Sequence, residues 1–322
     1  MRMLQVGQLS EDLSGVTLAT GVLPPIGPSQ LTVRVRAAAL NYPDLLMTRG
    51  DYQLKPSLPF TLGMEMAGDV VEAGLESGFQ PGDRVVAGTR LGSFADHVLI
   101  DAAGARRVPE GLDYAQAAAI GAAYLTAWVA LIALGEMRAG DWVLVHGATG
   151  GVGLAAVDLA GALGAQVIAT SRSADKLAVV ASEYPVVATL PASGFRDAVK
   201  EITGGGADLV FDPVGGDVFD ESTRCIGWGG RLLVVGFTGG RIASLPTNIA
   251  LIKGFSVIGV RAGEFGRRDP AAGRAAADAV WALAAERRIR PRIHATYPLE
   301  DWRAAFDTLA ASEHIGKLII EP

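Results

Sequence analysis

The sequence contains very little cysteine. Cys225 is the one cysteine among 322 residues, so no disulfide can form within the chain and no cluster of thiolate ligands can hold zinc. A single thiol is typical of proteins from reducing compartments, and we therefore expect a cytoplasmic location. The first residues, MRMLQVGQLSED, include no apolar run, so we expect no signal peptide.

Basic charge is also scarce. Lys and Arg total 28 against 34 Asp and Glu, which gives a net charge of −6. Proteins that bind nucleic acid need a basic surface to neutralise phosphates, so we expect no nucleic-acid partner. Half of the residues are hydrophobic and 19% are charged, which argues against disorder. The length is sufficient for two domains with buried cores.

One long stretch has no charged residue at all. Residues 115–135, AQAAAIGAAYLTAWVALIALG, are as long as a membrane-spanning helix. The stretch is mostly alanine, is split by Gly121, and is flanked by Asp113 and Glu136 rather than by a basic cluster. We interpret it as buried helices that join two domains, and we expect no membrane partner.

The hydrophobic pattern changes near Trp142. Before it, β-branched runs are punctuated by Gly and Pro, as in LTVRVRAAAL and GDRVVAG, which predicts a β-rich domain. After it, strands and helices alternate, which predicts a parallel sheet with helices on both faces. We expect strands at 142–146, 165–170, 186–189, 208–212, 231–236 and 255–260. We expect helices at 151–163, 173–182, 195–202, 217–226 and 271–287, and a final strand in GKLIIEP that returns to the first domain.

The segment WVLVHGATGGVG is typical of a dinucleotide-binding turn. Its buried strand is followed by the positions of a G-x-G-x-x-G fingerprint, occupied by Ala148, Gly150 and Gly153. Gly150 lets the backbone approach a pyrophosphate, and Gly153 lets the next helix pack closely on the strand. The alternative is a purely structural glycine turn. The turn residues expected to contact the cofactor are Ala148, Thr149, Gly150, Gly151, Val152 and Gly153.

No acidic residue stands at the end of the second strand of this unit, where an NAD ribose finds its carboxylate partner. The strand ends in Ser171, Arg172 and Ser173, with Lys176 one turn later. Ser171, Arg172 and Lys176 can clamp a 2′-phosphate with charge-assisted hydrogen bonds, so we predict NADPH rather than NADH. The alternative is that Arg172 and Lys176 are solvated surface residues. Asp175 is interpreted as a helix-start residue.

Several motifs together resemble one known family. They are LNYPDLLMTRGDYQLKPSLPFTLGMEMAGDVVEAG, GDRVVAG, AAAIGAAYLTAWVAL, VLVHGATGGVG, DPVGG, GGRLLVVGF and GKLII. This pattern resembles the medium-chain dehydrogenase/reductase superfamily and, within it, the zinc-free quinone oxidoreductase branch. The resemblance implies an α/β protein with a GroES-like β-rich catalytic domain, residues 1–118 and 264–322. It also implies a Rossmann domain with a doubly wound parallel sheet, residues 119–263, that binds NADP(H).

The resemblance also bears on metal chemistry. Zinc-dependent relatives carry Cys and His ligands at positions that correspond here to Asn41 and Met64. The four histidines show no ligand spacing; they are His97, His146, His294 and His314. Zinc-assisted alcohol oxidation is therefore not expected. A quinone or an α,β-unsaturated carbonyl delocalises the incoming charge and needs less help, so we expect a small-molecule electrophile of this kind as the substrate.

The resemblance assigns site residues one by one. It implies that Asn41 hydrogen-bonds the cofactor or a substrate oxygen, and that Tyr52 orients or protonates the substrate. It places Thr126 and Phe237 beside the nicotinamide, and Lys317 near the phosphates or the amide of the cofactor. Tyr52 has an alternative interpretation, in which its ring only packs against a loop.

Other charged residues receive structural interpretations. Asp44 is expected at a helix start and Glu65 beneath the active site. Arg261, Arg267 and Arg268 form a basic group that is either an exposed loop or a site for a phosphate-bearing substrate such as an acyl-CoA.

The apolar segment GFSVIGVRAG, residues 254–263, is predicted to be an edge strand. The resemblance implies that it pairs with its copy in a homodimer; the alternative is a covering loop from the same chain. Two further functional hypotheses stay open at this point. One is an enoyl-thioester reductase of the acryloyl-CoA kind, and the other is a non-catalytic NADPH-binding structural protein.

Overall fold

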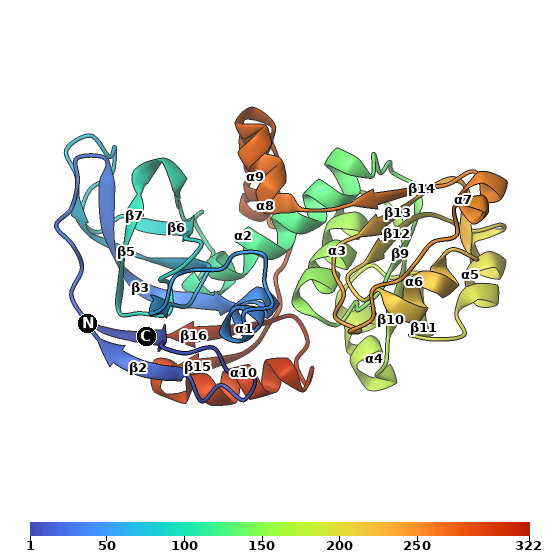
Figure 1. Cartoon of the computed structure of the whole chain (residues 1–322). Helices are drawn as coiled ribbons and strands as arrows, with labels where there is room; N and C mark the ends of the chain where they lie inside the picture. The colour runs from blue at the N-terminus through green and yellow to red at the C-terminus, as the bar shows by residue number, and fades with distance from the viewer. The chain divides into compact units, whose positions relative to one another are not determined.

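The computed structural model describes residues 1–322, and the chain divides into two compact units. The first unit comprises residues 1–122 and 291–322, and the second comprises residues 123–290. The first unit is rich in antiparallel strands, and the second contains a parallel sheet with accompanying helices (Figure 1). The predicted α/β fold class is therefore confirmed.

The first unit contains two sheets. Its strands are β1 (Arg2–Val6), β2 (Val16–Thr20), β3 (Gln30–Leu40), β4 (Phe60–Thr61), β5 (Glu65–Ala73), β6 (Arg84–Gly88), β7 (His97–Asp101), β8 (Ala105–Arg107), β15 (Ile293–Pro298) and β16 (Lys317–Glu321). The larger sheet has the order β15-β16-β3-β5-β6-β8, with β7 also paired to β3, and the smaller has the order β2-β1-β4. Short 3₁₀ turns lie at Ala102–Gly104 and Leu299–Asp301.

Strand β16 occupies an interior position of the larger sheet. It runs antiparallel to β3, with Leu318 opposite Leu40, and parallel to β15. Gly316 has a φ of +85°, and a Cβ there would lie 2.3 Å from the carbonyl oxygen of Arg292, so a glycine is required before the strand. The predicted return of GKLIIEP to the first domain is confirmed, because β16 belongs to the first unit.

Two helices pack on the strands of the first unit. They are α1 (Tyr42–Arg49) and α10 (Trp302–Ala310). Helix α1 ends at Gly50, whose φ of +80° suits a left-handed C-terminal residue. The buried core includes Phe94 and Phe306, whose rings meet edge to face at 6.3 Å, an arrangement favoured by the ring quadrupoles.

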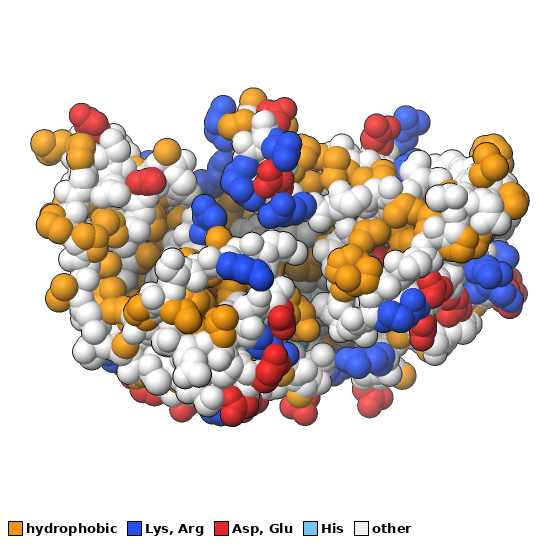
Figure 2. All heavy atoms as spheres, in the orientation of Figure 1, with side chains coloured by type: hydrophobic (Ala, Val, Ile, Leu, Met, Phe, Trp, Pro, Cys, Tyr) orange, Lys and Arg blue, Asp and Glu red, His pale blue; other side chains and the backbone are white.

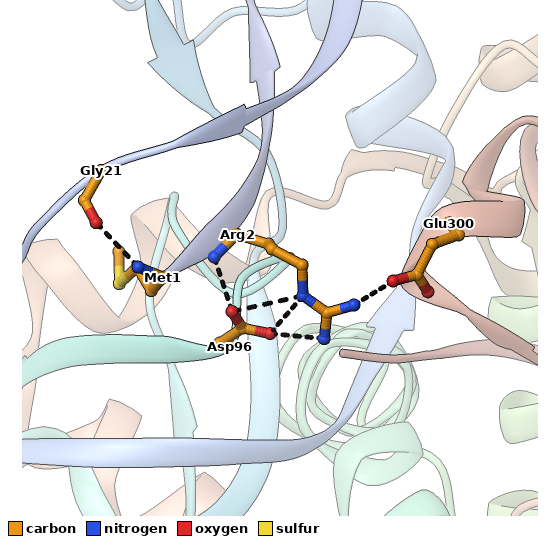
Figure 3. A network of polar contacts seen from close by, with 5 residues as sticks. All are labelled: Met1, Arg2, Gly21, Asp96 and Glu300. Carbon is orange, nitrogen blue, oxygen red and sulfur yellow. Dashed lines mark hydrogen bonds and ion pairs between the residues drawn. The ribbon is translucent and has the colours of Figure 1, made fainter.

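A polar network holds the start of β1 in the first unit (Figure 3). The terminal amino group of Met1 donates to the Gly21 carbonyl at 2.8 Å. The Arg2 guanidinium donates to both carboxylate oxygens of Asp96 and also pairs with Glu300. Because Glu300 comes from the late part of the chain, this network joins the two sequence segments of the first unit.

The uncharged stretch forms one continuous helix rather than two. Helix α2 (Tyr114–Trp128) passes through Gly121 and continues as a π-helical turn, Val129–Leu134. The prediction that Gly121 splits the stretch was wrong, because helix interiors tolerate a glycine at a cost of about 1 kcal/mol. The helix is long and apolar enough to cross a membrane by composition, and 56% of its most apolar window is buried inside the protein.

The second unit contains a parallel sheet of six strands. They are β9 (Trp142–Val145), β10 (Gln166–Ser171), β11 (Ala188–Pro191), β12 (Ala207–Asp212), β13 (Ile226–Val234) and β14 (Ser256–Gly259). Their order is β11-β10-β9-β12-β13-β14, and every pairing is parallel. The order reverses between β9 and β12, as in a doubly wound Rossmann sheet.

Helices accompany these strands, and two of them, at Thr247–Lys253 and Ala262–Arg268, were not predicted from the alternation. The helices are α3 (Gly151–Ala162), α4 (Ala174–Glu183), α5 (Arg196–Thr203), α6 (Gly216–Ser222), α7 (Thr247–Lys253), α8 (Ala262–Arg268) and α9 (Pro270–Ala285). Leu144, Val210 and Leu232 pack on one face of the sheet in a cluster with Phe195. Val143 and Phe211, whose side chains alternate to the other face, are also fully buried, so both faces are covered.

The two compact units end at other residues than the predicted domains do, and residues 119–122 belong to the first unit rather than to the second. Residues 264–290 belong to the second unit, whereas the sequence analysis placed them in the first. Specific bonds explain this. The Tyr184 hydroxyl donates to the Arg290 carbonyl at 2.9 Å, the Arg290 amide donates to Asp158, and Arg288 donates to the Ala162 carbonyl. The returning segment therefore begins near residue 291, after α9.

Candidate functional site

The glycine turn of the second unit connects β9 to α3. Gly147 has a φ of +58°, which a residue with a side chain rarely adopts. Ala148 is fully buried, and its amide donates to the Thr170 carbonyl at 3.0 Å. Gly150 is the N-cap of α3, so the unpaired amides and the positive dipole end of this helix face the turn.

Two glycines of the turn are required for different reasons. A Cβ on Gly153 would lie 2.1 Å from the Gly147 carbonyl oxygen, so only glycine lets the helix pack this closely. A Cβ on Gly150 would meet its nearest atom, the Gly147 oxygen, at 3.5 Å, which is ordinary contact. Packing therefore does not demand glycine at 150. A group that approaches the backbone there does, so the turn fits a pyrophosphate above the helix N-terminus.

The turn lies at the point where the strand order reverses. Parallel sheets bind ligands outside the carboxyl ends of the strands at such a point. The ends of β9 and β12 are neighbours here, because a Cβ on Gly147 would lie 3.5 Å from both Pro213 and Val214. The side chain of Asp212 shapes the second turn by accepting from the Val214 and Gly215 amides at 2.8 and 2.9 Å.

Asp212 is a feature that sequence reasoning did not single out. Its side chain is fully buried, and its second oxygen, Oδ2, has no hydrogen-bond partner. Burial raises the pKa of this carboxyl group, and the two backbone amides oppose the rise. The signal in the sequence was the position of an acid directly after a buried apolar strand, FDPVGG.

Phe237 lies on the same side of the unit. Its ring would contact a Cβ on Gly215 at 3.0 Å, and 46% of its surface is exposed. The loop that carries Phe237 is anchored to the Asp212 turn, because the Thr238 amide donates to the Pro213 carbonyl at 3.1 Å. Phe237 therefore lies beside the end of β12, near the predicted cofactor crevice.

The end of β10 carries the residues predicted to hold a 2′-phosphate. The Ser171 hydroxyl lies 3.2 Å from the Thr149 hydroxyl, which joins this strand end to the glycine turn. Ser173 caps α4 by accepting from the Lys176 amide at 3.3 Å, which places Lys176 in the first helical turn. Arg172 is exposed, and its guanidinium forms no hydrogen bond or ion pair in the structure. The structure thus places Ser171 and Arg172 at the end of β10 and Lys176 in the first turn of α4.

His146 has a structural role directly before the glycine turn. It is fully buried between the Thr170 and Ser222 hydroxyls, at 2.8 Å from each. Ser222 gives its own proton to the Val218 carbonyl, so its oxygen accepts from His146 Nε2–H and the Thr170 hydroxyl donates to Nδ1. Burial lowers the pKa of His146 to about 3, so the ring is neutral.

A second group of predicted residues forms a buried cluster in the first unit. The Lys317 ammonium donates to Asn41 Oδ1 at 2.6 Å and to Glu65 Oε1 at 3.0 Å. The Asn41 amide nitrogen donates to Glu65 Oε1 at 2.9 Å and to the Ala39 carbonyl at 3.1 Å. All three side chains are more than nine-tenths buried. We call Asn41, Glu65 and Lys317 the lysine cluster.

The backbone of α2 supports the lysine cluster. The Ala122 amide of α2 donates to Glu65 Oε2 at 2.7 Å. This bond requires a glycine at the preceding position, because a Cβ on Gly121 would lie 2.8 Å from Glu65 Oε2. The sequence interpretation of Glu65 as a structural residue is refined by these contacts. The isolated glycine in an alanine-rich helix was the sequence signal for this close approach of the Glu65 carboxylate to the helix backbone.

Asp44 lies beside the cluster in the first turn of α1. Its carboxylate accepts from the backbone amide of Asn41 at 2.9 Å and from the backbone amide of Gly63 at 3.2 Å. The predicted helix-start position is therefore confirmed. Burial raises the pKa of Asp44 to about 7, although the two amides and Lys317 act in the opposite direction.

The remaining predicted residues have less specific surroundings. Tyr52 is partly buried against the core of the first unit, and Thr126 lies in the last turn of α2. Arg267 and Arg268 are exposed and form ion pairs with Glu264 on the same helix. Chemical roles for Tyr52 and Thr126 stay predictions. No group of three or more His, Cys, Asp or Glu side chains is arranged to hold a metal ion.

Comparisons with known proteins agree with this architecture. Residues 27–110 match the family model for the alcohol dehydrogenase GroES-like domain, and residues 151–279 match the model for zinc-binding dehydrogenases. The chain is 36% identical over 303 residues to a quinone oxidoreductase-like protein 2 homolog from Nematostella vectensis, which covers 92% of this chain and 82% of that protein.

Two further relatives extend the comparison. The structure of Escherichia coli quinone oxidoreductase complexed with NADPH superposes with a TM-score of 0.90 at 26% identity, and each chain is covered completely. A mycocerosic acid synthase-like polyketide synthase from Mycobacterium tuberculosis is 35% identical over 320 residues, which are 96% of this chain and 15% of that protein.

Proposed function

Because the chain belongs to the quinone oxidoreductase-like branch of the medium-chain dehydrogenase/reductase superfamily, we propose that it is an NADPH-dependent reductase of quinones or α,β-unsaturated carbonyl compounds. It is an oxidoreductase of this family, with a GroES-like unit and a Rossmann unit that holds a nicotinamide cofactor. The observation that carries the cofactor choice is the exposed, unpaired Arg172 at the end of β10.

Three residues support the preference for NADPH. Ser171, Arg172 and Lys176 stand where an NAD site places a carboxylate, and the nearby Thr149 ties them to the glycine turn. Because Arg172 has no partner to give up, binding a phosphate costs it no existing bond. The bound cofactor supplies a hydride, and the residues of the chain hold its phosphates and orient its acceptor.

Replacement of Arg172 tests the cofactor proposal. A hydrogen bond to a charged group contributes about 1.5–3 kcal/mol, so Arg172→Ala is expected to weaken NADPH binding about 10- to 150-fold. NADH lacks the 2′-phosphate, so its affinity is expected to stay unchanged. The measurement is a fluorescence titration with both cofactors. Arg224→Ala is the matched control, because Arg224 is also an exposed arginine of the second unit. Equal losses for both cofactors would contradict the proposal.

The choice of substrate class rests on the residues at the family's metal positions. Asn41 is engaged with Glu65 and Lys317, and Met64 offers only a weak thioether ligand. Without a metal ion to polarise it, the acceptor needs a conjugated carbonyl that spreads the incoming charge. We expect turnover of 1,2-naphthoquinone or of a simple enone with NADPH by protein dialysed against a chelator. Loss of turnover on dialysis would refute metal independence.

Reduction of an enoyl thioester is a second candidate function. The observation in its favour is the 35% identity, over 96% of this chain, with a mycocerosic acid synthase-like polyketide synthase. Arg261, Arg267 and Arg268 surround the single carboxylate of Glu264 and leave a surplus of positive charge. Selective loss of crotonyl-CoA reduction in an Arg267→Ala/Arg268→Ala variant would favour this candidate. Binding of NADPH without turnover of any acceptor would favour a non-catalytic role.

The proposal includes a homodimer through residues 254–263. β14 is an edge strand of the sheet, and apolar side chains are exposed around it and α7 (Figure 2). Trp228 is 83% exposed and lies against Gly254, where a Cβ would approach the indole ring to 2.9 Å. Large exposed apolar patches mark interaction surfaces, and an edge strand that meets its own copy forms a closed two-fold contact.

A further inference from the structure

We propose that Lys317 donates a hydrogen bond to the carbonyl oxygen of the substrate, with Asn41 and Glu65 as its positioning residues. This inference rests on the proposed reduction of a conjugated carbonyl. It differs from the role in cofactor binding that the family resemblance implies for Lys317, and from a donor role for Asn41.

Asn41 has no donor left for a substrate. A side-chain amide carries two N–H groups, and here they go to the Glu65 carboxylate and the Ala39 carbonyl. The orientation of the amide is fixed, because Glu65 and Ala39 can only accept and Lys317 can only donate. Asn41 therefore presents its oxygen to the ammonium group and cannot supply an N–H to a ligand without losing an existing bond.

Lys317 does have a donor left. An ammonium group carries three N–H bonds, and two of them go to Asn41 Oδ1 and Glu65 Oε1. No third acceptor contacts it, although the side chain is only 5% exposed. Buried donors are normally satisfied, so this N–H is an unused donor held in a fixed direction. Asn41 and Lys317 retain 8% and 5% exposure, so the cluster borders the surface of the first unit.

Glu65 offsets the electrostatic cost of burying the Lys317 ammonium group. Its carboxylate balances the charge of the buried ammonium and is held by the Ala122 amide. Gly121 leaves the space that this amide contact needs. The donor is therefore pre-positioned by bonds that exist before any substrate arrives, and a low-dielectric surrounding strengthens its effect on a developing negative charge.

In the proposed step, an electron pair moves onto the carbonyl oxygen of the substrate. A hydride adds to the β-carbon of the C=C–C=O unit, the π electrons shift, and the carbonyl oxygen receives an electron pair. The third N–H of Lys317 donates to that oxygen and stabilises the enolate. A proton from solvent water then adds to the α-carbon, which gives the saturated carbonyl compound. For a quinone, the same N–H meets the oxygen that becomes the phenolate.

The main experiment compares binding with turnover in a charge-balanced variant. Lys317→Met combined with Glu65→Gln removes both members of the ion pair and leaves no unpaired buried charge. We expect kcat for an enone to fall about 100- to 1,000-fold at saturating NADPH, as for loss of an oxyanion donor. The dissociation constant of NADPH is expected to stay unchanged. Lys253→Met is the matched control, because Lys253 is a partly buried lysine that donates to the Thr223 carbonyl.

A reversed pattern would overturn the inference. If NADPH binding weakens while kcat at saturation is retained, Lys317 acts on the cofactor instead. If wild-type protein reduces no conjugated carbonyl, the proposed function fails, and this outcome is separate because it does not depend on any variant.

A spectroscopic measurement on the wild-type protein is independent of turnover and of variant folding. 4-Nitrophenol carries an oxygen that mimics the enolate, and a neighbouring ammonium donor favours its ionised form. We expect the phenolate absorbance of 4-nitrophenol bound with NADP⁺ to appear at lower pH than that of the free phenol. An unshifted or raised ionisation would contradict a donor at this position, even in a protein that reduces enones.

Discussion

Replacement of Gly121 by alanine has two effects on stability that act in opposite directions. Alanine is the better helix former, and a Gly→Ala change in a helix interior stabilises by about 1 kcal/mol when space is available. Space is not available here, because the new Cβ would lie 2.8 Å from Glu65 Oε2. The carboxylate must move away, and the hydrogen bond from the Ala122 amide, now 2.7 Å long, would be lost or lengthened.

The magnitudes decide the direction of the change. A hydrogen bond to a charged group contributes about 1.5–3 kcal/mol, which exceeds the gain of about 1 kcal/mol in helix propensity. The net loss is about 0.5–2 kcal/mol, and units of this size lose about 2–4 °C in Tm for each kcal/mol. We therefore expect Gly121→Ala to lower the Tm by about 1–8 °C.

Differential scanning calorimetry provides the measurement, and a second glycine provides the control. Gly263 lies in α8, and a Cβ there meets no atom within 4 Å, so Gly263→Ala is expected to raise stability slightly. A Gly121→Ala protein as stable as the wild type, alongside a stabilised control, would refute the argument. It would mean that the Glu65 carboxylate relaxes without loss.

Two further predictions concern the second unit. His146 is neutral when folded and titrates near 6.5 when unfolded, so its contribution to stability is lost as the pH falls below about 6.5 towards 3. Relative to His146→Gln, the free energy of unfolding of the wild type should fall by about 2 kcal/mol between pH 7 and pH 5 in urea titrations. A difference between the two proteins that does not change with pH would contradict this. Asp44 contributes to the pH dependence in the opposite direction, but its contribution is the same in both proteins and cancels. Trp228→Glu is expected to convert the proposed dimer to a monomer in sedimentation velocity, whereas the control Leu75→Glu, at an exposed leucine of the first unit, should not.

The architecture was predictable where one strong local pattern determined it. The alternation of buried strands and helices from Trp142 onward predicted every strand of the second unit, because parallel strands covered on both faces are apolar at successive positions. The boundary near residue 264 was not predictable in the same way. Residues 264–290 are placed by single contacts such as Tyr184 to Arg290, and no hydrophobic period records these contacts.

The candidate site likewise has a part that the sequence pattern predicted and a part that it did not. The turn from Ala148 to Gly153 and the acid-free end of β10 are contiguous in sequence, so their spacing carries the information. The lysine cluster joins residues that are far apart, and only the resemblance to a family suggested Asn41 and Lys317. Which atom of each residue bonds to which partner could not be read from the chain, because it depends on the register of β16 against β3.

The interior position of β16 has a consequence for the order of events during synthesis. Asn41 and Lys317 are 276 positions apart, and all of residues 123–290 are made between them. The second unit can therefore leave the ribosome and fold around its own sheet while the larger sheet of the first unit still lacks an inner strand. The ammonium group of Lys317 is therefore added only after the whole second unit, so a nascent chain can acquire its nucleotide fold before the lysine cluster is complete.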